Sequence, residues 1–138
     1  VVQACQALVP GMAERGWGRV VMITSITVVH PYRHFALSNT IRPGLEGLCA
    51  TLTQEFAGQG VTANIVCPGI TATDRIRTLL DSKVEQGSSL EAAERELTTK
   101  IPVGRMGKPE ELGESIAFLA SDRAGFILVI DGGQSVND

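Results

Sequence analysis

GRVVMITS, residues 18–25, is the stretch that decides the fold. Its apolar, β-branched run predicts a buried parallel strand over 19–24, and the strand leads directly into Ser25. A second run, VTANIV, predicts another strand over 61–66, and Cys67-Pro68-Gly69 then turns the chain out of the sheet. FILVI at 126–130 predicts a third strand, which Asp131-Gly132-Gly133 closes as a structural turn.

Helical segments separate these runs. Residues 1–14 have apolar side chains at helical spacing, although Pro10 is expected to kink the helix or end its first segment. A long helix is predicted over 36–57, with an interruption at Pro43-Gly44. Its apolar stripe consists of Leu37, Ile41, Leu45, Leu48, Leu52 and Phe56. The last helices are signalled by a capping box, Ser88 with Glu91 for a helix over 89–99, and by Pro109 at a first helical position. Strands joined by helix-bearing connections are parallel, so the fold class is α/β.

Bulk composition limits the possible functions. The chain has 138 residues, 43% hydrophobic and 20% charged, with a net charge of −3, which argues against nucleic acid or an anionic membrane as a partner. No run approaches the ~18 apolar residues of a membrane span, and no signal peptide is visible. Cys5, Cys49 and Cys67 form neither a CxxC pair nor a metal-like cluster, which predicts buried thiols, no metal site and a cytoplasmic location. The chain begins at Val1 without an initiator methionine, so we expect a fragment.

Several motifs occur together in one order. They are GRVVMITS, then ALSN opening a helix that continues as GLEGLCATLTQEFAGQGVTANIVCPG, then IPVGRMGKPEELGESIAFLASDRA and DGG. Together they resemble the short-chain dehydrogenase/reductase family, in particular members similar to 3-oxoacyl-carrier-protein reductases. The resemblance implies one partial domain over residues 1–138. That domain is the C-terminal half of a Rossmann-like doubly wound parallel sheet, with three strands and flanking helices.

The family's first half has no counterpart in this sequence. That half carries the glycine-rich loop that binds the cofactor pyrophosphate, and no G-x-x-x-G-x-G or G-x-G-x-x-G element occurs here. The resemblance implies NAD or NADP as cofactor, but the residues that choose between them would precede Val1.

The resemblance also implies a catalytic serine, tyrosine and lysine. Ser25 lies at the serine position, where a hydroxyl polarises the substrate oxygen, and Thr24 is the lesser candidate; the alternative for Ser25 is a hydroxyl that caps the strand end. The tyrosine and lysine positions fall on Phe35 and Asn39. Phe35 has no proton to give, and the uncharged Asn39 can only hydrogen-bond a ribose hydroxyl. The gap from Ser25 to Phe35 is about three residues shorter than the family's, so the loop is remodelled as well.

Other side chains near this loop could replace the missing groups. Tyr32, the only tyrosine of the chain, is the best candidate for the proton donor. His30 and His34 titrate near neutrality and are lesser candidates. Arg42, three residues after Asn39, could supply the missing positive charge. For each of these residues the alternative is an ordinary loop or surface role.

The turn after the second strand resembles the family's nicotinamide-binding segment. Pro68, Gly69, Ile70, Thr71 and Thr73 are the predicted cofactor contacts, through the Ile70 backbone and a threonine hydroxyl. A turn that leaves the carboxyl end of a strand lies at the ligand crevice of such folds. Residues 74–100 then form a cover over the substrate.

Three functional readings follow. The first is an NAD(P)-dependent oxidoreductase that acts on a carbonyl or secondary alcohol, with a 3-oxoacyl thioester as one candidate substrate. The second is a non-catalytic dinucleotide-binding or subunit-interaction member, and the third is an inactive fragment. The resemblance further implies a homo-oligomer, dimer or tetramer. The stripe of Leu45, Leu48 and Leu52 is compatible either with that interface or with packing on the sheet.

Overall fold

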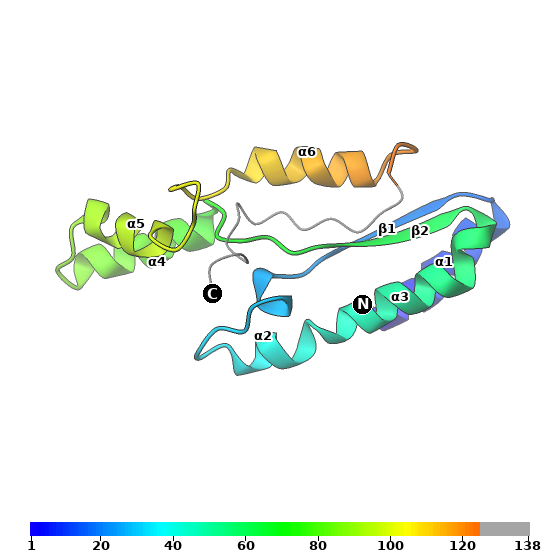
Figure 1. The fold of residues 1–138 in the computed structure, drawn as a ribbon, viewed down its shortest axis with the longest axis horizontal. Helices are drawn as coiled ribbons and strands as arrows, with labels where there is room; N and C mark the ends of the chain where they lie inside the picture. The colour runs from blue at the N-terminus through cyan, green and yellow to red at the C-terminus, as the bar shows by residue number, and fades with distance from the viewer. Residues whose placement is uncertain (125–138) are drawn as a thin grey trace.

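The computed structural model describes residues 1–124 (Figure 1). Its strands are β1, Gly18–Ile23, and β2, Val61–Val66. Its helices are α1 (Val2–Glu14), η1 (Ile26–Val28), α2 (Ala36–Ile41), α3 (Gly44–Phe56), η2 (Ala57–Gln59), α4 (Asp74–Glu85), α5 (Leu90–Thr98) and α6 (Pro109–Leu119), η1 and η2 being short 3₁₀ turns. The predicted third strand and Asp131-Gly132-Gly133 lie outside the described residues.

The two described strands are parallel, as predicted. They pair in register from Gly18 opposite Val61 to Ile23 opposite Val66. Since α3 carries the chain back from the end of β1 to the start of β2, the helix-bearing connection expected from the sequence is present. Both strands therefore end at the same edge of the sheet.

Side chains alternate between two cores on opposite faces of the sheet. On one face, Ala63 and Ile65 of β2 pack with residues of α1 and α3; the buried members include Cys5, Val9, Cys49 and Leu52. On the other face, Val66 packs with Leu119 of α6. Helices thus cover both faces, with α1 and α3 on one side and α6 on the other (Figure 1). This is the layering of a doubly wound fold.

The three cysteines are free and buried, as predicted. Burial raises the pKa of the Cys49 thiol, which keeps it protonated and unreactive. None of the described helices is long and apolar enough to cross a membrane.

Proline affects the helices differently from the sequence prediction. Helix α1 runs through Pro10 to Glu14 without ending. Pro10 has no N–H for the carbonyl of Gln6, but both residues are exposed, so water can reach that carbonyl. Of the two predicted alternatives, a kink or the end of a helical segment, the second is therefore wrong.

At Pro43 the break is real and divides the predicted 36–57 helix into α2 and α3. The predicted apolar stripe is therefore not continuous across the two helices. Leu37 and Ile41 are 78% and 64% exposed, whereas Leu45, Leu48 and Leu52 pack on the core of the sheet. Of the two predicted alternatives, an oligomer interface or packing on the sheet, the leucines of α3 thus show packing on the sheet of this chain.

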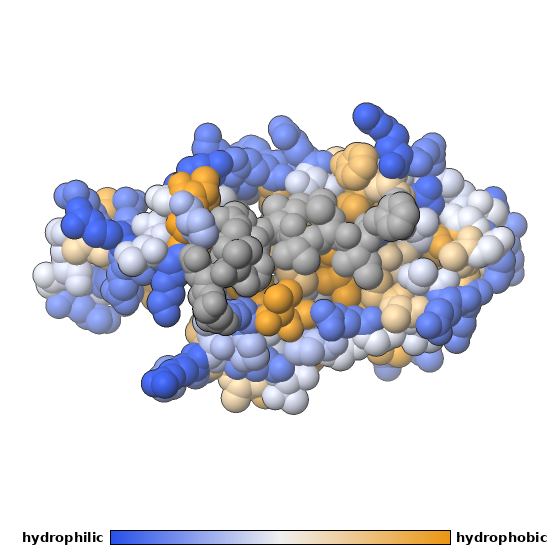
Figure 2. Space-filling view, in the orientation of Figure 1, coloured by the Kyte–Doolittle hydropathy of each residue, from blue (hydrophilic) through white to orange (hydrophobic). Residues whose placement is uncertain are grey.

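Helices α4 and α5 extend beyond the carboxyl ends of the strands, where the sequence predicted a cover (Figure 1). Hydrophilic side chains dominate the outer surface of this end (Figure 2). The residue that caps α5 is Ser89, whose Oγ accepts from the Ala92 N–H at 3.1 Å. The capping box predicted at Ser88 was one residue out of place, because Ser88 instead donates its N–H to Lys83 in the turn that ends α4.

Gly60 packs directly against the backbone of Gly16. It has φ +77°, and a Cβ built on it would lie 2.0 Å from the carbonyl oxygen of Gly16. Its own carbonyl accepts from the Gly18 N–H where β1 begins. A side chain here would have to move the backbone that starts β1.

A left-handed backbone alone costs a residue with a side chain roughly 1–2 kcal/mol. We expect Gly60→Ala to destabilise the protein by clearly more than this, because its Cβ also meets the Gly16 carbonyl. Gly16→Ala is the matched control, since Gly16 has φ +69° but nothing within 4 Å of a built Cβ. Urea unfolding of both variants gives the comparison. Equal losses of stability would contradict the steric argument.

A carboxylate fixes the start of α6, which begins at Pro109 as predicted. Glu111 accepts from the Arg105 guanidinium at 2.6 and 2.8 Å and from the Lys108 N–H at 2.7 Å. These hydrogen bonds, with Arg105 the larger cause, lower the pKa of Glu111 from 4.5 to about 2. The ionised carboxylate is therefore the form that the fold favours.

Because the pKa of Glu111 is lower in the folded chain, its stabilisation is present above pH 4.5 and is lost as the pH falls through about 2. We expect Glu111→Gln to lower the melting temperature slightly at pH 7, since the pair is exposed to solvent, and the difference from wild type to shrink towards pH 2. Glu110→Gln is the control, because it removes the same charge from the same helical turn. If the difference in melting temperature between Glu111→Gln and wild type did not change with pH, the stabilisation would not come from the ionised carboxylate.

Candidate active site

The loop after β1 and the turn after β2 are bound to each other beyond the ends of the strands. The Thr24 N–H donates to Val66 O at 2.8 Å, and the Ile26 N–H donates to Pro68 O at 2.9 Å. Ser25 lies between these two bonds. The predicted serine and the predicted nicotinamide-binding turn are therefore neighbours at one edge of the sheet.

Ser25 is half-buried and caps η1 through its hydroxyl. Its Oγ accepts from the Thr27 N–H at 3.2 Å. The hydroxyl thus caps the turn after the strand rather than the strand end that the alternative named, and this bond uses only a lone pair and leaves the O–H as a donor. Thr24, the lesser candidate, is buried, and its hydroxyl donates to Val66 O at 3.1 Å and contacts Cys67 Sγ at 3.2 Å. Ser25 is the better placed hydroxyl for a ligand.

The side chains of the predicted tyrosine and lysine positions are directed to the loop that precedes α2. Phe35 is 49% exposed and meets Tyr32 edge-on at 6.3 Å between ring centroids. Asn39 donates its Nδ2 hydrogen to Tyr32 O at 2.7 Å. Its Oδ1 is buried without a hydrogen-bond partner within residues 1–124. Asn39 therefore holds the loop and keeps one acceptor available.

Tyr32 contacts aromatic side chains on both sides of it in this loop. It is half-buried, and its ring also meets His30 edge-on, at 6.0 Å. His34 is exposed and has φ +66°, a left-handed conformation that is uncommon for a residue with a side chain. Within residues 1–124, no hydrogen bond or ring contact joins Phe35 or Asn39 directly to Ser25, so their predicted roles rest on the resemblance to the family.

Ser38 of α2 and Arg42, the residue after this helix, bind the Ser25 loop directly. Ser38 Oγ lies 2.9 Å from Thr27 Oγ1, and Arg42 Nη1 donates to Thr24 O at 2.7 Å. Sequence analysis missed Ser38 and gave Arg42 only as an alternative. Their four-residue spacing, which places two side chains on one helix face, was the signal that could have identified the pair.

The turn itself is held in place by the segment before α6. Residues Ile70 to Ala72 bridge to Gly107, with the Gly107 N–H donating to Ile70 O at 3.0 Å and the Ala72 N–H to Gly107 O at 2.8 Å. Thr71 donates its hydroxyl to Gly69 O at 3.3 Å, and Thr73 precedes α4. The conformation of the predicted nicotinamide contact is thus fixed by backbone hydrogen bonds.

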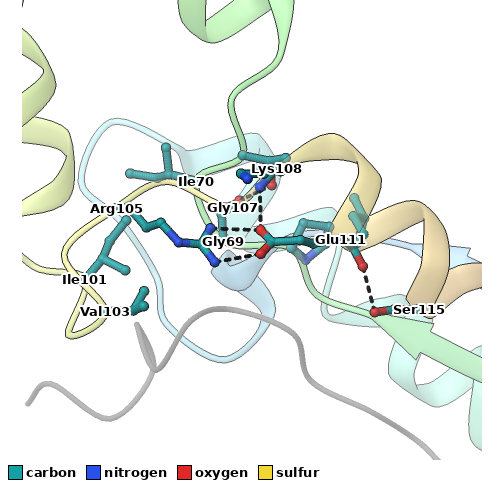
Figure 3. A pocket seen from close by; sticks show the side chains of 12 residues that line it. Gly69, Ile70, Ile101, Val103, Arg105, Gly107, Lys108, Glu111 and Ser115 are labelled. Atoms are coloured by element: carbon teal, nitrogen blue, oxygen red, sulfur yellow. Dashed lines mark hydrogen bonds and ion pairs between the residues drawn. The ribbon is translucent and has the colours of Figure 1, made fainter.

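A cavity of about 270 Å³ opens between this turn and α6. Pro68, Gly69, Ile70 and Thr71 line it together with the Arg105–Glu111 pair. Figure 3 shows this pair close to Gly69 and Gly107. Ser25 is not among the lining residues. Within residues 1–124, no group of three or more His, Cys, Asp or Glu side chains is arranged to hold a metal ion.

Comparisons with known proteins agree with this arrangement. Residues 1–135 match the family described as enoyl-(acyl carrier protein) reductase. Acetoacetyl-CoA reductase of Rhizobium meliloti is 36% identical over 128 residues, which is 90% of this chain and 49% of the relative. The inactive 2-(S)-hydroxypropyl-CoM dehydrogenase 2 of Xanthobacter autotrophicus is 33% identical over 137 residues, covering 96% of this chain and 57% of the relative. The chain thus spans about half the length of these curated relatives.

Solved structures show the same similarity. L-sorbose reductase from Gluconobacter frateurii, complexed with NADPH and L-sorbose, superposes with a TM-score of 0.87 at 28% identity, covering 97% of this chain and 53% of that one. A tyrosine-to-phenylalanine variant of ElxO with NADPH bound gives 0.78 at 28% identity, covering 91% and 49%. Sequence motifs, layered fold and comparisons agree, and this chain belongs to the short-chain dehydrogenase/reductase family.

Proposed function

We propose that the complete protein is an NAD(P)-dependent oxidoreductase that reduces a carbonyl or oxidises a secondary alcohol at the carboxyl edge of β1 and β2. The observation that carries this proposal is the hydrogen bond from Ile26 N to Pro68 O, which keeps the Ser25 loop beside the turn at 68–73. A hydroxyl for the substrate oxygen and a turn for the cofactor are thereby held together, as hydride transfer requires.

The substrate class that we propose is a 3-oxoacyl thioester. Acetoacetyl-CoA reductase, the relative with 36% identity, is named for such a substrate. In this chain α4 and α5 extend beyond the carboxyl ends of the strands and carry exposed apolar side chains that an acyl chain could contact; these include Leu79, Val84 and Leu90.

The residues present fit the nicotinamide half of the cofactor. The buried Oδ1 of Asn39 has no hydrogen-bond partner in the described chain and could accept from a ribose hydroxyl. The rigid turn from Pro68 to Thr73 would hold the carboxamide through the Ile70 backbone and the hydroxyl of Thr71 or Thr73. When bound, the nicotinamide supplies or accepts the hydride.

The protein's own residues would manage the charge on the substrate oxygen. The Ser25 hydroxyl donates to that oxygen as it becomes an alkoxide. Phe35 cannot deliver a proton, so we propose Tyr32, which lies in the loop that Asn39 holds, as the donor. The NADPH-bound ElxO variant shows that a phenylalanine replacement is compatible with cofactor binding in that protein.

The second candidate is a family member that binds the cofactor but does not convert a substrate. Phe35 and Asn39 favour it, because neither side chain can repeat the tyrosine–lysine chemistry. One relative of 33% identity is named as inactive. Self-association into a dimer or tetramer stays a prediction under either function.

The two candidates separate in one experiment on the complete gene product. We expect consumption of NADPH or NADH with acetoacetyl-CoA, followed by the absorbance of the reduced cofactor. Cofactor binding without turnover across 3-oxoacyl thioesters and simple ketones would contradict the oxidoreductase and support the second function. In that case Phe35→Tyr with Asn39→Lys should raise the rate.

Ser25→Ala tests the proposed hydroxyl. We expect kcat to fall by about 10²–10³-fold, the usual loss for one oxyanion donor, while the cofactor dissociation constant changes little. Ser25→Thr is the matched control, because it keeps a hydroxyl on the same extended backbone (φ −167°, ψ 155°). Similar rates for the alanine and threonine variants would remove Ser25 from the chemistry.

A further inference from the structure

Gly107, in the segment before α6, holds the turn at 68–73 by two backbone hydrogen bonds. Its N–H donates to Ile70 O at 3.0 Å, and its carbonyl accepts from the Ala72 N–H at 2.8 Å. The two bonds lie on either side of Thr71, and a Cβ built on Gly107 would be 3.7 Å from Thr71 Oγ1. The position of Gly107 therefore determines the position of the turn to which we assign the nicotinamide contact.

The segment that presents Gly107 is itself fixed by one carboxylate. Glu111 accepts from the Lys108 N–H at 2.7 Å and from both terminal nitrogens of Arg105, at 2.6 and 2.8 Å. Arg105 Nη1 also donates to Met106 O at 3.0 Å. The residues on both sides of Gly107 are thus tied to a single side chain of α6, and Figure 3 shows this pair beside Gly107. A bidentate guanidinium–carboxylate pair fixes an orientation as well as a distance.

Side-chain packing does not supply this constraint where the turn meets the cavity. Gly69, Ile70 and Thr71 line the cavity of about 270 Å³ together with Arg105 and Glu111. A turn that borders open space has few van der Waals contacts there, so its hydrogen bonds control its geometry. The pair is also exposed, with side-chain exposures of 50% and 45%, so we expect it to contribute little to the stability of the whole fold. Its effect is on the local geometry of the turn.

We propose that Glu111 is a positioning residue for the nicotinamide: with Arg105 it sets the place of Gly107, and Gly107 sets the turn that contacts the ring. The inference rests on the proposed function and deepens it, because it adds a residue of α6 that acts without touching the substrate or the cofactor. Hydride transfer is sensitive to the placement of the ring, and a misplacement of ~1 Å can cost about 10²-fold in rate. A change at Glu111 should therefore affect binding of the ring and leave binding of the adenosine half unchanged.

The test compares two ligands on the complete protein, the reduced dinucleotide and the matching ADP-ribose, which lacks only the nicotinamide ring. Dissociation constants are measured by calorimetry, with NADPH or NADH according to which binds the wild type. In Glu111→Ala we expect binding of the dinucleotide to weaken about tenfold, because the turn loses its fixed geometry. Binding of ADP-ribose should change less than about twofold, because it has no ring for the turn to hold.

Three further variants make the result specific. Glu110→Ala removes an exposed carboxylate from the same helical turn and should leave both dissociation constants unchanged. Glu111→Gln keeps an oxygen that can accept from the Lys108 N–H and should retain part of the wild-type affinity for the dinucleotide. The effects of Arg105→Ala and Glu111→Ala should not add when the two are combined, because both variants open the same contact.

The outcomes are distinguishable. In Glu111→Ala, a loss for ADP-ribose as large as that for the dinucleotide would show a general structural role and overturn the inference, as would no change in either ligand. If Glu111→Ala does not fold, the same comparison in Arg105→Ala decides, and the absence of a loss specific to the dinucleotide overturns the inference. The proposed function fails separately, in the wild type. A protein that binds neither ligand, or binds the dinucleotide no more tightly than ADP-ribose, would overturn the nicotinamide contact at the turn, and this inference with it.

Discussion

The parallel pairing of β1 with β2 extends past the formal ends of both strands, and the rest of the structure depends on this extension. Ile23 and Val66 form the last paired positions, but Thr24 N and Ile26 N continue the ladder onto Val66 O and Pro68 O. Without these two bonds, the Ser25 loop and the turn at 68–73 would be independent surface segments. With them, two segments more than 40 residues apart in sequence become one rigid edge.

The sequence predicts this edge well because its signals are local and agree with one another. The second strand was predicted at its observed bounds, 61–66, since a β-branched run lies between Gly60 and Pro68, two residues that stop regular structure. Helices were predicted less accurately. Pro10 is tolerated because its lost hydrogen bond faces solvent, and Ser89 caps α5 because Ser88 is needed to end α4. These outcomes depend on exposure and on competition between neighbouring turns, which periodicity does not record.

The candidate site was predictable in part for the same reason. Ser25 follows directly from the end of a strand, so its place in space follows from the topology. The α2 residues depend instead on a loop of altered length, and a shift of a few residues changes which helix face meets the strand ends. Alignment selected Phe35 and Asn39, whereas direct hydrogen bonds to the Ser25 loop come from Ser38 and Arg42. Only coordinates reveal which face is directed inward.

A lysine beside a phenol can lower the phenol's pKa, and one side-chain pair then both holds the cofactor and moves the proton. This chain has Asn39 at the predicted lysine position, and its only tyrosine lies in the loop before α2, where Tyr32 O accepts from Asn39 Nδ2. If Asn39 and Tyr32 serve the site as proposed, cofactor binding and proton delivery come from different segments. Such a site can bind the cofactor even where proton delivery is slow, so the same residues are compatible with a slow reductase and with a cofactor-binding relative that has lost turnover.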